Sequence, residues 1–124
     1  MHEKAQAIKK DLLGKVRAKD GVNILAEVID LESAEEVKNI LFELRNQVEN
    51  LICVLGSVVN EKPSISVMIS DNLVKEKNWN AGNLVKQLAV EIKGGGGGQA
   101  FYATAGGTDA SGLLKAVNRI MQLI

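Results

Sequence analysis

Cysteine and histidine are almost missing from this chain, which has one of each, Cys53 and His2, in 124 residues. A lone cysteine excludes an internal disulfide, and without a cluster of both residue types we expect neither a metal site nor histidine-dependent catalysis. Cys53 lies inside the most apolar segment, where a cysteine is usually a small core residue, so we assign it no role. The sequence therefore predicts no catalytic residue, no metal ligand and no cofactor in this chain.

Net charge and long apolar runs are missing as well. Fifteen basic residues balance fifteen acidic residues, so a polyanion would have to be held by a local patch rather than by the field of the whole molecule. No stretch is apolar and long enough to cross a membrane, and the charged amino terminus lacks the apolar segment of a signal peptide. We therefore expect a cytoplasmic protein with no membrane partner. With aromatic residues at only 3%, we expect no stacking platform for single-stranded nucleic acid.

Hydrophobic residues make up 46% of the chain, which is enough to build the core of one domain. Residues 22–30 and 51–59 are rich in β-branched and apolar residues and predict strands. Ser33 and Glu36 form the capping box of a helix between them, so we expect a crossover unit with parallel strands. The turn at residues 60–63, followed by alternating apolar residues, predicts an antiparallel hairpin. Together these patterns indicate an α/β fold, a single domain with a mixed β-sheet flanked by helices.

The second half of the chain continues this pattern. Residues 84–92 carry an apolar helical stripe that ends at a run of glycines. A short strand is expected at residues 100–104, followed by a turn at residues 105–107. Thr108 or Asp109 is then expected to cap the last helix.

The amino-terminal segment allows two interpretations. Residues 2–19 carry apolar residues at helical spacing among many charges and predict one amphipathic helix. We interpret residues 1–20 as the end of a helical connector, with Met1 standing inside a longer parent protein, and residues 21–124 as the globular domain. An ordinary first helix packed on the sheet is an equally good interpretation of the same pattern.

Five consecutive glycines, Gly94–Gly98, are the most distinctive feature that is present. Glycine loses more backbone entropy on folding than any other residue, so a folded domain that keeps such a run needs positive φ or very close backbone approach there. Bare N–H groups in a loop can converge on phosphate or sugar oxygens and form an anion-binding concavity. A flexible linker is the alternative, but the apolar residues on both sides, Ile92 and 100–102, disfavour an exposed tether. Ending the preceding helix is the minimum role of the run.

The spacing around the glycines excludes two kinds of nucleotide-binding loop. No Gly-Lys-Ser/Thr follows the run, as the phosphate-binding loop of a nucleotide hydrolase requires. The dinucleotide fingerprint runs from a strand through glycines into a helix, whereas this run follows a helix and leads into a strand. We therefore expect the chain to hydrolyse no nucleotide.

Residues 93–110, KGGGGGQAFYATAGGTDA, resemble the carboxy-terminal signature of the alanyl-tRNA synthetase family. That family ends in a small globular domain, related to the domain associated with DHH-type phosphoesterases, in which polyglycine leads to an Ala-x-Ala-Gly-Gly turn and a last helix. Gly94–Gly98 and 105–107 match this motif, and the order of the upstream elements is also similar to that domain. The chain departs from the motif at Gln99, where many members have arginine, and at Ala100, where proline is frequent. Loss of the arginine cation weakens the case for a strong phosphate contact.

The resemblance implies a non-catalytic module of a ligase. Such a module is expected to contact the outer corner of tRNA(Ala), to help the aminoacylation and editing centres use one tRNA, and to contribute to a homodimer. The other domains of the parent synthetase would be its partners and would use ATP, magnesium and zinc upstream of this chain. Two alternatives remain open: the substrate-binding half of a DHH-type phosphoesterase, and a pure oligomerisation module.

The predicted nucleic-acid-binding residues surround the glycine run. Lys93 supplies a cation, Gln99 offers hydrogen bonds to a base edge or a ribose hydroxyl, and Tyr102 offers an aromatic ring. Trp79, between two asparagines, is interpreted as a loop anchor in preference to a base-stacking residue. The predicted set is Lys93, Gly94, Gly95, Gly96, Gly97, Gly98, Gln99, Tyr102, Gly106 and Gly107, with the last two shaping the adjacent turn.

Overall fold

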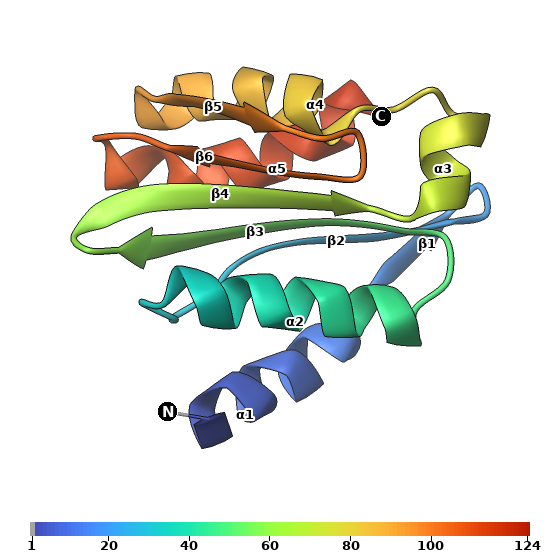
Figure 1. Cartoon of the computed structure of the whole chain (residues 1–124), viewed down its shortest axis with the longest axis horizontal. Coiled ribbons are helices and arrows are strands. Elements are labelled where there is room, and N and C mark those ends of the chain that lie inside the picture. Colours follow the sequence, from blue (N-terminus) through green and yellow to red (C-terminus); the bar gives the residue numbers. More distant parts are fainter. Residues whose placement is uncertain (1) are drawn as a thin grey trace.

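The computed structural model describes residues 2–124, and across them a six-stranded sheet lies between two groups of helices (Figure 1). The strand order is β1-β2-β3-β4-β6-β5. The strands are β1 (Arg17–Lys19), β2 (Val22–Val28), β3 (Leu51–Val59), β4 (Lys62–Ile69), β5 (Gly95–Gly98) and β6 (Tyr102–Gly106). The helices are α1 (His2–Leu13), α2 (Ala34–Gln47), α3 (Asp71–Glu76), α4 (Ala81–Ala89) and α5 (Leu113–Leu123), with 3-10 turns η1 (Val90–Ile92) and η2 (Ala110–Gly112).

The sheet is mixed, as the sequence predicts. β2 and β3 run parallel, and α2 connects them. All other neighbouring strands are antiparallel, including the predicted β3–β4 hairpin. Asn60 and Glu61 turn that hairpin with φ values of 52° and 68°, which suit a two-residue turn between right-twisted strands. The α/β class is therefore confirmed.

Each face of the sheet has its own hydrophobic core. On one face α2 packs through Leu41 and Leu44, and α1 lies on the outer side of α2 (Figure 1). On the other face α4 and α5 pack through residues that include Leu88 and Val117. The first part of β3, residues 51–55, is fully buried, because helices cover both of its faces. This explains why β3 is apolar without alternation.

The amino-terminal helix is shorter than the sequence predicts. The apolar spacing predicts a helix over residues 2–19, but α1 ends at Leu13 and Arg17–Lys19 forms strand β1. The reason is the Asp20-Gly21 pair, whose φ values are 52° and 81°. Two residues with positive φ build a tight hairpin turn, and this turn returns the chain antiparallel onto β2.

The glycine-rich stretch forms two strands instead of a loop and a turn. The sequence predicts a loop at Gly94–Gly98 and a turn at residues 105–107, but most of the glycines form β5, and Ala105 and Gly106 end β6. The reason is pairing. β6 lies between β4 and β5 and makes an antiparallel ladder with each, so the small residues at its end are held inside the sheet.

The last helix is entered through η2. Asp109, one of the two predicted capping residues, accepts a hydrogen bond from the Ser111 N–H at 3.1 Å and caps η2. A second hydrogen bond, from the Ser111 hydroxyl, is the main reason why the pKa of Asp109 is lowered. Thr108 donates its hydroxyl to the Lys93 carbonyl at 3.5 Å and does not cap a helix.

Candidate nucleic-acid interface

Strand β5 forms one edge of the sheet and consists only of glycine. It follows Lys93, whose φ of 53° ends η1 in the left-handed region. None of Gly94–Gly98 has a φ in that region, so of the two predicted reasons for the run, positive φ or close backbone approach, the first does not apply. β5 pairs with β6 on its inner side and packs against α4 (Figure 1).

Close backbone approach explains the glycines, and it does so at every second position. A Cβ at Gly94, Gly96 or Gly98 would lie 2.0, 2.2 or 2.7 Å from the nearest backbone atom, which β6 contributes. A Cβ at Gly95, by contrast, would meet no atom within 4 Å. The predicted close approach is therefore confirmed, because alanine at the three alternate positions would push β5 away from β6.

The amides of β5 do not converge on one point. The Gln99 N–H donates to the Tyr102 carbonyl at 2.9 Å, and antiparallel ladders alternate between bonded and non-bonded pairs. Gly96 and Gly98 therefore point their N–H and C=O groups away from β6. The Gly98 carbonyl faces α4, where a Cβ on Gly82 would lie 3.0 Å from its oxygen. The predicted anion-binding concavity is thus not formed, because successive amides of an extended strand point in opposite directions.

A groove with a volume of about 310 Å³ lies beside the end of β5. Four of the predicted residues line it, namely Gly97, Gly98, Gln99 and Tyr102. The remaining lining residues come from β6, from the residue before it and from α2, and they are Lys38, Phe42, Phe101, Ala103 and Thr104. The groove therefore combines side-chain-free backbone with one amide, one phenol and one ammonium group.

Aromatic rings gather along one wall of this groove, and two cations lie against them. The rings of Phe42 and Tyr102 lie 5.5 Å apart between centroids. Lys38 Nζ lies 5.9 Å from the first ring centroid and 5.8 Å from the second. Arg45 Cζ lies 5.8 Å from the Phe42 centroid and 5.6 Å from that of Phe101, so both cations stand within the range of cation–π attraction. The fold therefore collects three aromatic residues in one place, although the chain has few of them.

Tyr102 is half-buried in this wall. Burial raises the pKa of its phenol, so the hydroxyl stays protonated near neutral pH and can donate a hydrogen bond. Lys38, Phe42 and Arg45 escaped the sequence prediction because they lie on α2, far from the glycines in sequence. They are four and three residues apart, which places them on one helical face. This spacing is the sequence pattern that could have indicated them.

The other predicted residues lie outside the groove. Lys93 is exposed at the opposite end of β5 from Gln99. Gly106 pairs with both Ser64 and Gly95. Gly107 lies directly against η1, and only glycine fits there because a Cβ would lie 2.2 Å from the Ile92 carbonyl oxygen. We therefore find that the predicted set divides into groove residues and residues that shape the glycine-rich sheet edge.

Lys86 supplies a cation near β5 that the sequence prediction missed. Its Cε lies 3.4 Å from the position that a Cβ on Gly97 would take. Lys86 belongs to α4, whose first turn is tied to the β5–β6 connection by hydrogen bonds from Ala81 and Gly82 N–H to the Ala100 and Gln99 carbonyls. These bonds occupy the amino terminus of α4, so it offers no N–H groups to an anion.

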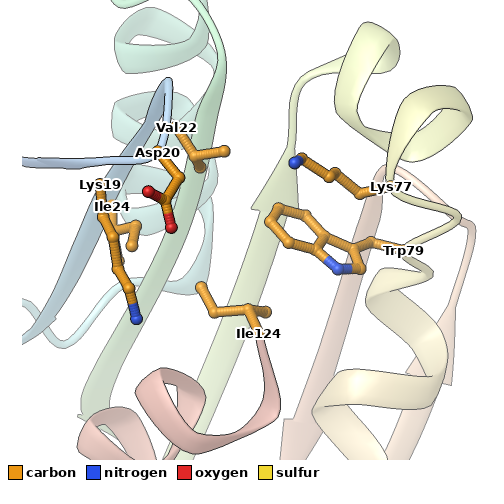
Figure 2. Close-up of a pocket in the computed structure, with 7 residues that line it drawn as sticks. All are labelled: Lys19, Asp20, Val22, Ile24, Lys77, Trp79 and Ile124. Atoms are coloured by element: carbon orange, nitrogen blue, oxygen red, sulfur yellow. The ribbon is translucent and has the colours of Figure 1, made fainter.

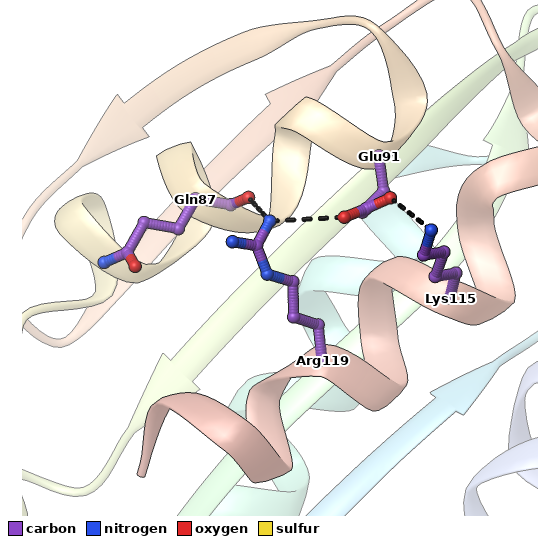
Figure 3. Close-up of polar contacts among 4 residues, drawn as sticks. All are labelled: Gln87, Glu91, Lys115 and Arg119. Carbon is purple, nitrogen blue, oxygen red and sulfur yellow. Dashed lines mark hydrogen bonds and ion pairs between the residues drawn. The ribbon is translucent and has the colours of Figure 1, made fainter.

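A polar cluster fixes η1, the turn that precedes the glycines (Figure 3). Glu91 pairs with Arg119 at 3.2 Å and with Lys115 at 3.5 Å. Arg119 also donates to the Gln87 carbonyl at 2.9 Å. The backbone contact is equally close, since a Cβ on Gly112 would overlap the Glu91 carbonyl oxygen. The cluster therefore holds α4, η1 and α5 together at the start of β5.

The described part of the chain shows no group of three His, Cys, Asp or Glu residues placed to hold a metal ion. Within the same residues, no helix combines the length and the apolar character needed to cross a membrane.

Comparisons with known proteins identify relatives across the whole chain. A family model described as the DHHA1 domain matches residues 21–124. An alanine–tRNA ligase of Bacteroides fragilis is 47% identical over 99% of the chain, and one of Cytophaga hutchinsonii is 43% identical over 98%. The match covers only 14% of each ligase, so the chain spans about a seventh of the length of these relatives.

A solved structure has the same fold. The crystal structure of the C-Ala domain from Aquifex aeolicus alanyl-tRNA synthetase matches 87% of this chain and 96% of that chain, with a TM-score of 0.75 and 21% sequence identity. The shared fold and the sequence relatives thus agree, and the chain belongs to the DHHA1 domain family, as a homologue of the carboxy-terminal region of alanine–tRNA ligases.

Proposed function

We propose that the groove beside β5 contacts tRNA and that this chain is the non-catalytic carboxy-terminal module of an alanine–tRNA ligase. The observation that carries the proposal is the meeting of Lys38, Phe42 and Tyr102 beside bare glycine backbone. Proteins bind RNA by offering cations to its phosphates and aromatic side chains to its unstacked bases. The groove offers both, and membership of this family supports a tRNA over other polyanions.

The module would hold tRNA(Ala) at its outer corner while aminoacylation and editing take place in other domains of the parent. Catalysis and the ATP, magnesium and zinc that serve it would belong to those domains, because the matched region is only 14% of each relative. A role in protein synthesis places the parent in the cytoplasm. Contribution to a homodimer would be a second task of the same module.

Few cations serve the groove, and this sets the expected salt dependence. Lys38 and Lys86 lie near the glycines, while Arg45 forms an ion pair with Asp71 at 3.8 Å. The slope of log affinity against log salt should therefore correspond to about one to three phosphate contacts. A basic RNA-binding protein would show a much steeper slope.

Titration of labelled tRNA(Ala) with the chain and its variants tests the proposal. Lys38→Ala should weaken binding roughly threefold to tenfold and lower the salt slope by about one contact. Lys62→Ala is the matched control, because Lys62 is an exposed lysine in the β3–β4 hairpin and lines no part of the groove. Equal affinities and equal slopes for the two variants would contradict the proposal.

Gln99→Arg tests the same surface by a gain of binding. One exposed charge-assisted contact to phosphate should tighten tRNA binding by about 1 kcal/mol, or roughly fivefold. The variant changes no buried residue, since Gln99 is exposed. If neither Lys38→Ala nor Gln99→Arg alters tRNA affinity in a folded protein, the glycine edge is structural and the module serves assembly instead.

A further inference from the structure

A second pocket lies toward the opposite edge of the sheet, where the β1–β2 turn faces the α3–α4 connection and Ile124 (Figure 2). Its volume is about 100 Å³. A cavity of about 150 Å³ in an engineered protein takes up a benzene ring, so this smaller, open pocket takes the edge of a ring while the rest of a ligand stays outside. None of its residues lines the groove beside β5.

The inside of the pocket is an apolar slot. Val22 and Ile24 form its floor and are 5% and 4% exposed. The indole of Trp79 and the side chain of Ile124 lie on the other side, and Figure 2 shows the indole between Lys77 and Ile124. A planar ring suits a slot with one aromatic wall, since every nucleobase has a π-face that can stack.

The rim of the pocket carries charges of both signs. Lys19 and Asp20 come from the β1–β2 turn, and Lys77 comes from the end of α3. All three residues are exposed, and in the described part of the chain none of them forms an ion pair. Two cations and one carboxylate favour a ligand that has an anionic group together with an N–H donor.

We propose that this pocket binds a purine nucleotide. One edge of the base enters the slot beside Trp79, the Asp20 carboxylate accepts a hydrogen bond from a base N–H, and Lys19 and Lys77 hold the phosphate. Free nucleotides and unpaired purines of an RNA strand present the same chemistry. Trp79 then has a binding role in addition to anchoring its loop.

Trp79 is the only tryptophan in the sequence, so its fluorescence reports on this pocket alone. Titration of the 124-residue chain with adenosine 5′-monophosphate should give a saturable change in emission. Ribose 5-phosphate and inorganic phosphate at the same concentrations should give none, because they lack the ring. Equal responses to all three, or no saturable response to the nucleotide, would overturn the proposal.

Three variants test whether the ligand binds in this pocket. Lys77→Ala and Asp20→Asn should each weaken nucleotide binding roughly fivefold, since each removes one charge-assisted contact. Asparagine tolerates the φ of 52° at position 20, so this turn is kept. Lys62→Ala should bind as the parent chain does. Unchanged affinity in both pocket variants would refute the assignment.

A short single-stranded oligoadenylate separates the two ligand sources. Tighter binding of the oligonucleotide than of the mononucleotide assigns the pocket to RNA, and the reverse assigns it to free nucleotide. Lys38→Ala should leave mononucleotide binding unchanged, because Lys38 belongs to the other groove. This outcome is independent of the tRNA titration, so each proposal can fail without the other.

Discussion

At the scale of single residues, alternate glycines decide how β5 can be used. Gly94, Gly96 and Gly98 let the strand lie against β6, where a Cβ would overlap backbone atoms. The strand that results is extended, and its amides point alternately inward and outward. In the proposed tRNA contact, recognition therefore depends on neighbouring side chains such as Lys38 and Tyr102, and the bare backbone would allow the tRNA to come close to them.

Gly95→Ala and Gly96→Ala should differ sharply in stability. A Cβ at position 96 would lie 2.2 Å from the Thr104 carbonyl oxygen, and forced displacement of packed atoms costs about 1–3 kcal/mol. A Cβ at position 95 meets nothing within 4 Å and restricts the unfolded chain, so we expect no loss and at best a gain of about 0.4–1 kcal/mol. Urea unfolding of both variants measures the difference. Equal midpoints would show that the β5–β6 approach is looser than described.

Cys53 should be inert in the native protein. Its side chain is completely buried in β3, and burial raises the pKa of its thiol, so little of the reactive thiolate forms. A thiol reagent at mildly alkaline pH should label the chain only as fast as it unfolds, and denaturant should expose one thiol per chain. Rapid labelling of a protein that keeps its circular dichroism spectrum would contradict this expectation.

At the scale of elements, the cluster around Glu91 joins α4, η1 and α5 at the start of β5. Its two cations differ in burial, since the Arg119 side chain is 33% exposed and that of Lys115 is 77% exposed. Exposed ion pairs are worth little because water and salt screen them. The hydrogen bond from Arg119 to the Gln87 carbonyl is therefore the stronger tie between the two helices.

Arg119→Ala should lower the free energy of unfolding by about 1 kcal/mol, because it removes a hydrogen bond together with an ion pair. Lys115→Ala should change it by at most about 0.5 kcal/mol. Chemical denaturation of both variants, with Glu91→Gln as the partner in a double-mutant cycle, measures the coupling. A larger loss for Lys115→Ala would reverse our ranking of the two contacts.

The elements were largely predictable because their signals are local. The capping box at Ser33, the apolar run of β3 and the turn at residues 60–63 all lie within the element that they define, and the structure confirms each. The wrong predictions lie in segments whose structure depends on the strand with which they pair. Asp20-Gly21 is itself a local hairpin signal, but the apolar spacing over residues 2–19 predicts a long helix up to this turn. The glycine run became a strand only through its ladder with β6.

The site was less predictable than the fold. Gln99 and Tyr102, which line the candidate groove, could be predicted because they adjoin the glycines in sequence. Lys38, Phe42 and Arg45 meet them only because α2 packs over the sheet beside β6. Their spacing places them on one helical face but does not indicate which strand that face will meet. Three aromatic residues in one wall also show why a low overall content did not exclude an aromatic cluster.

At the scale of the whole molecule, two hydrophobic cores, one on each face of the sheet, hold the helices and strands together. The first helix belongs to this arrangement, since Leu12 is 1% exposed and joins the core around α2. β1, which follows α1, is paired with β2. We therefore expect residues 2–124 to unfold in one cooperative transition, with α1 included.

Leu12→Ala and Leu13→Ala test whether α1 is part of that unit. Leu12→Ala should cost about 2–5 kcal/mol, the range for a truncated core leucine. Leu13 is 37% exposed, so Leu13→Ala should stay within about 0.5 kcal/mol of the parent. Calorimetry of both variants gives the comparison. Equal and small losses would mean that α1 is a tethered connector and that the core closes without it.

The positions of β5 at which a Cβ fits also predict which codons of the glycine run can change. Codons 94, 96 and 98 can leave glycine only at the expense of folding, whereas a Cβ at position 95 meets open space and one at position 97 meets only the flexible end of Lys86. A random-codon library selected for folded protein alone should therefore keep glycine at alternate positions and release the two between them. If selection for translation in cells preserves all five, the pressure on codons 95 and 97 comes from a molecule outside this chain, and the library would show where that molecule touches it.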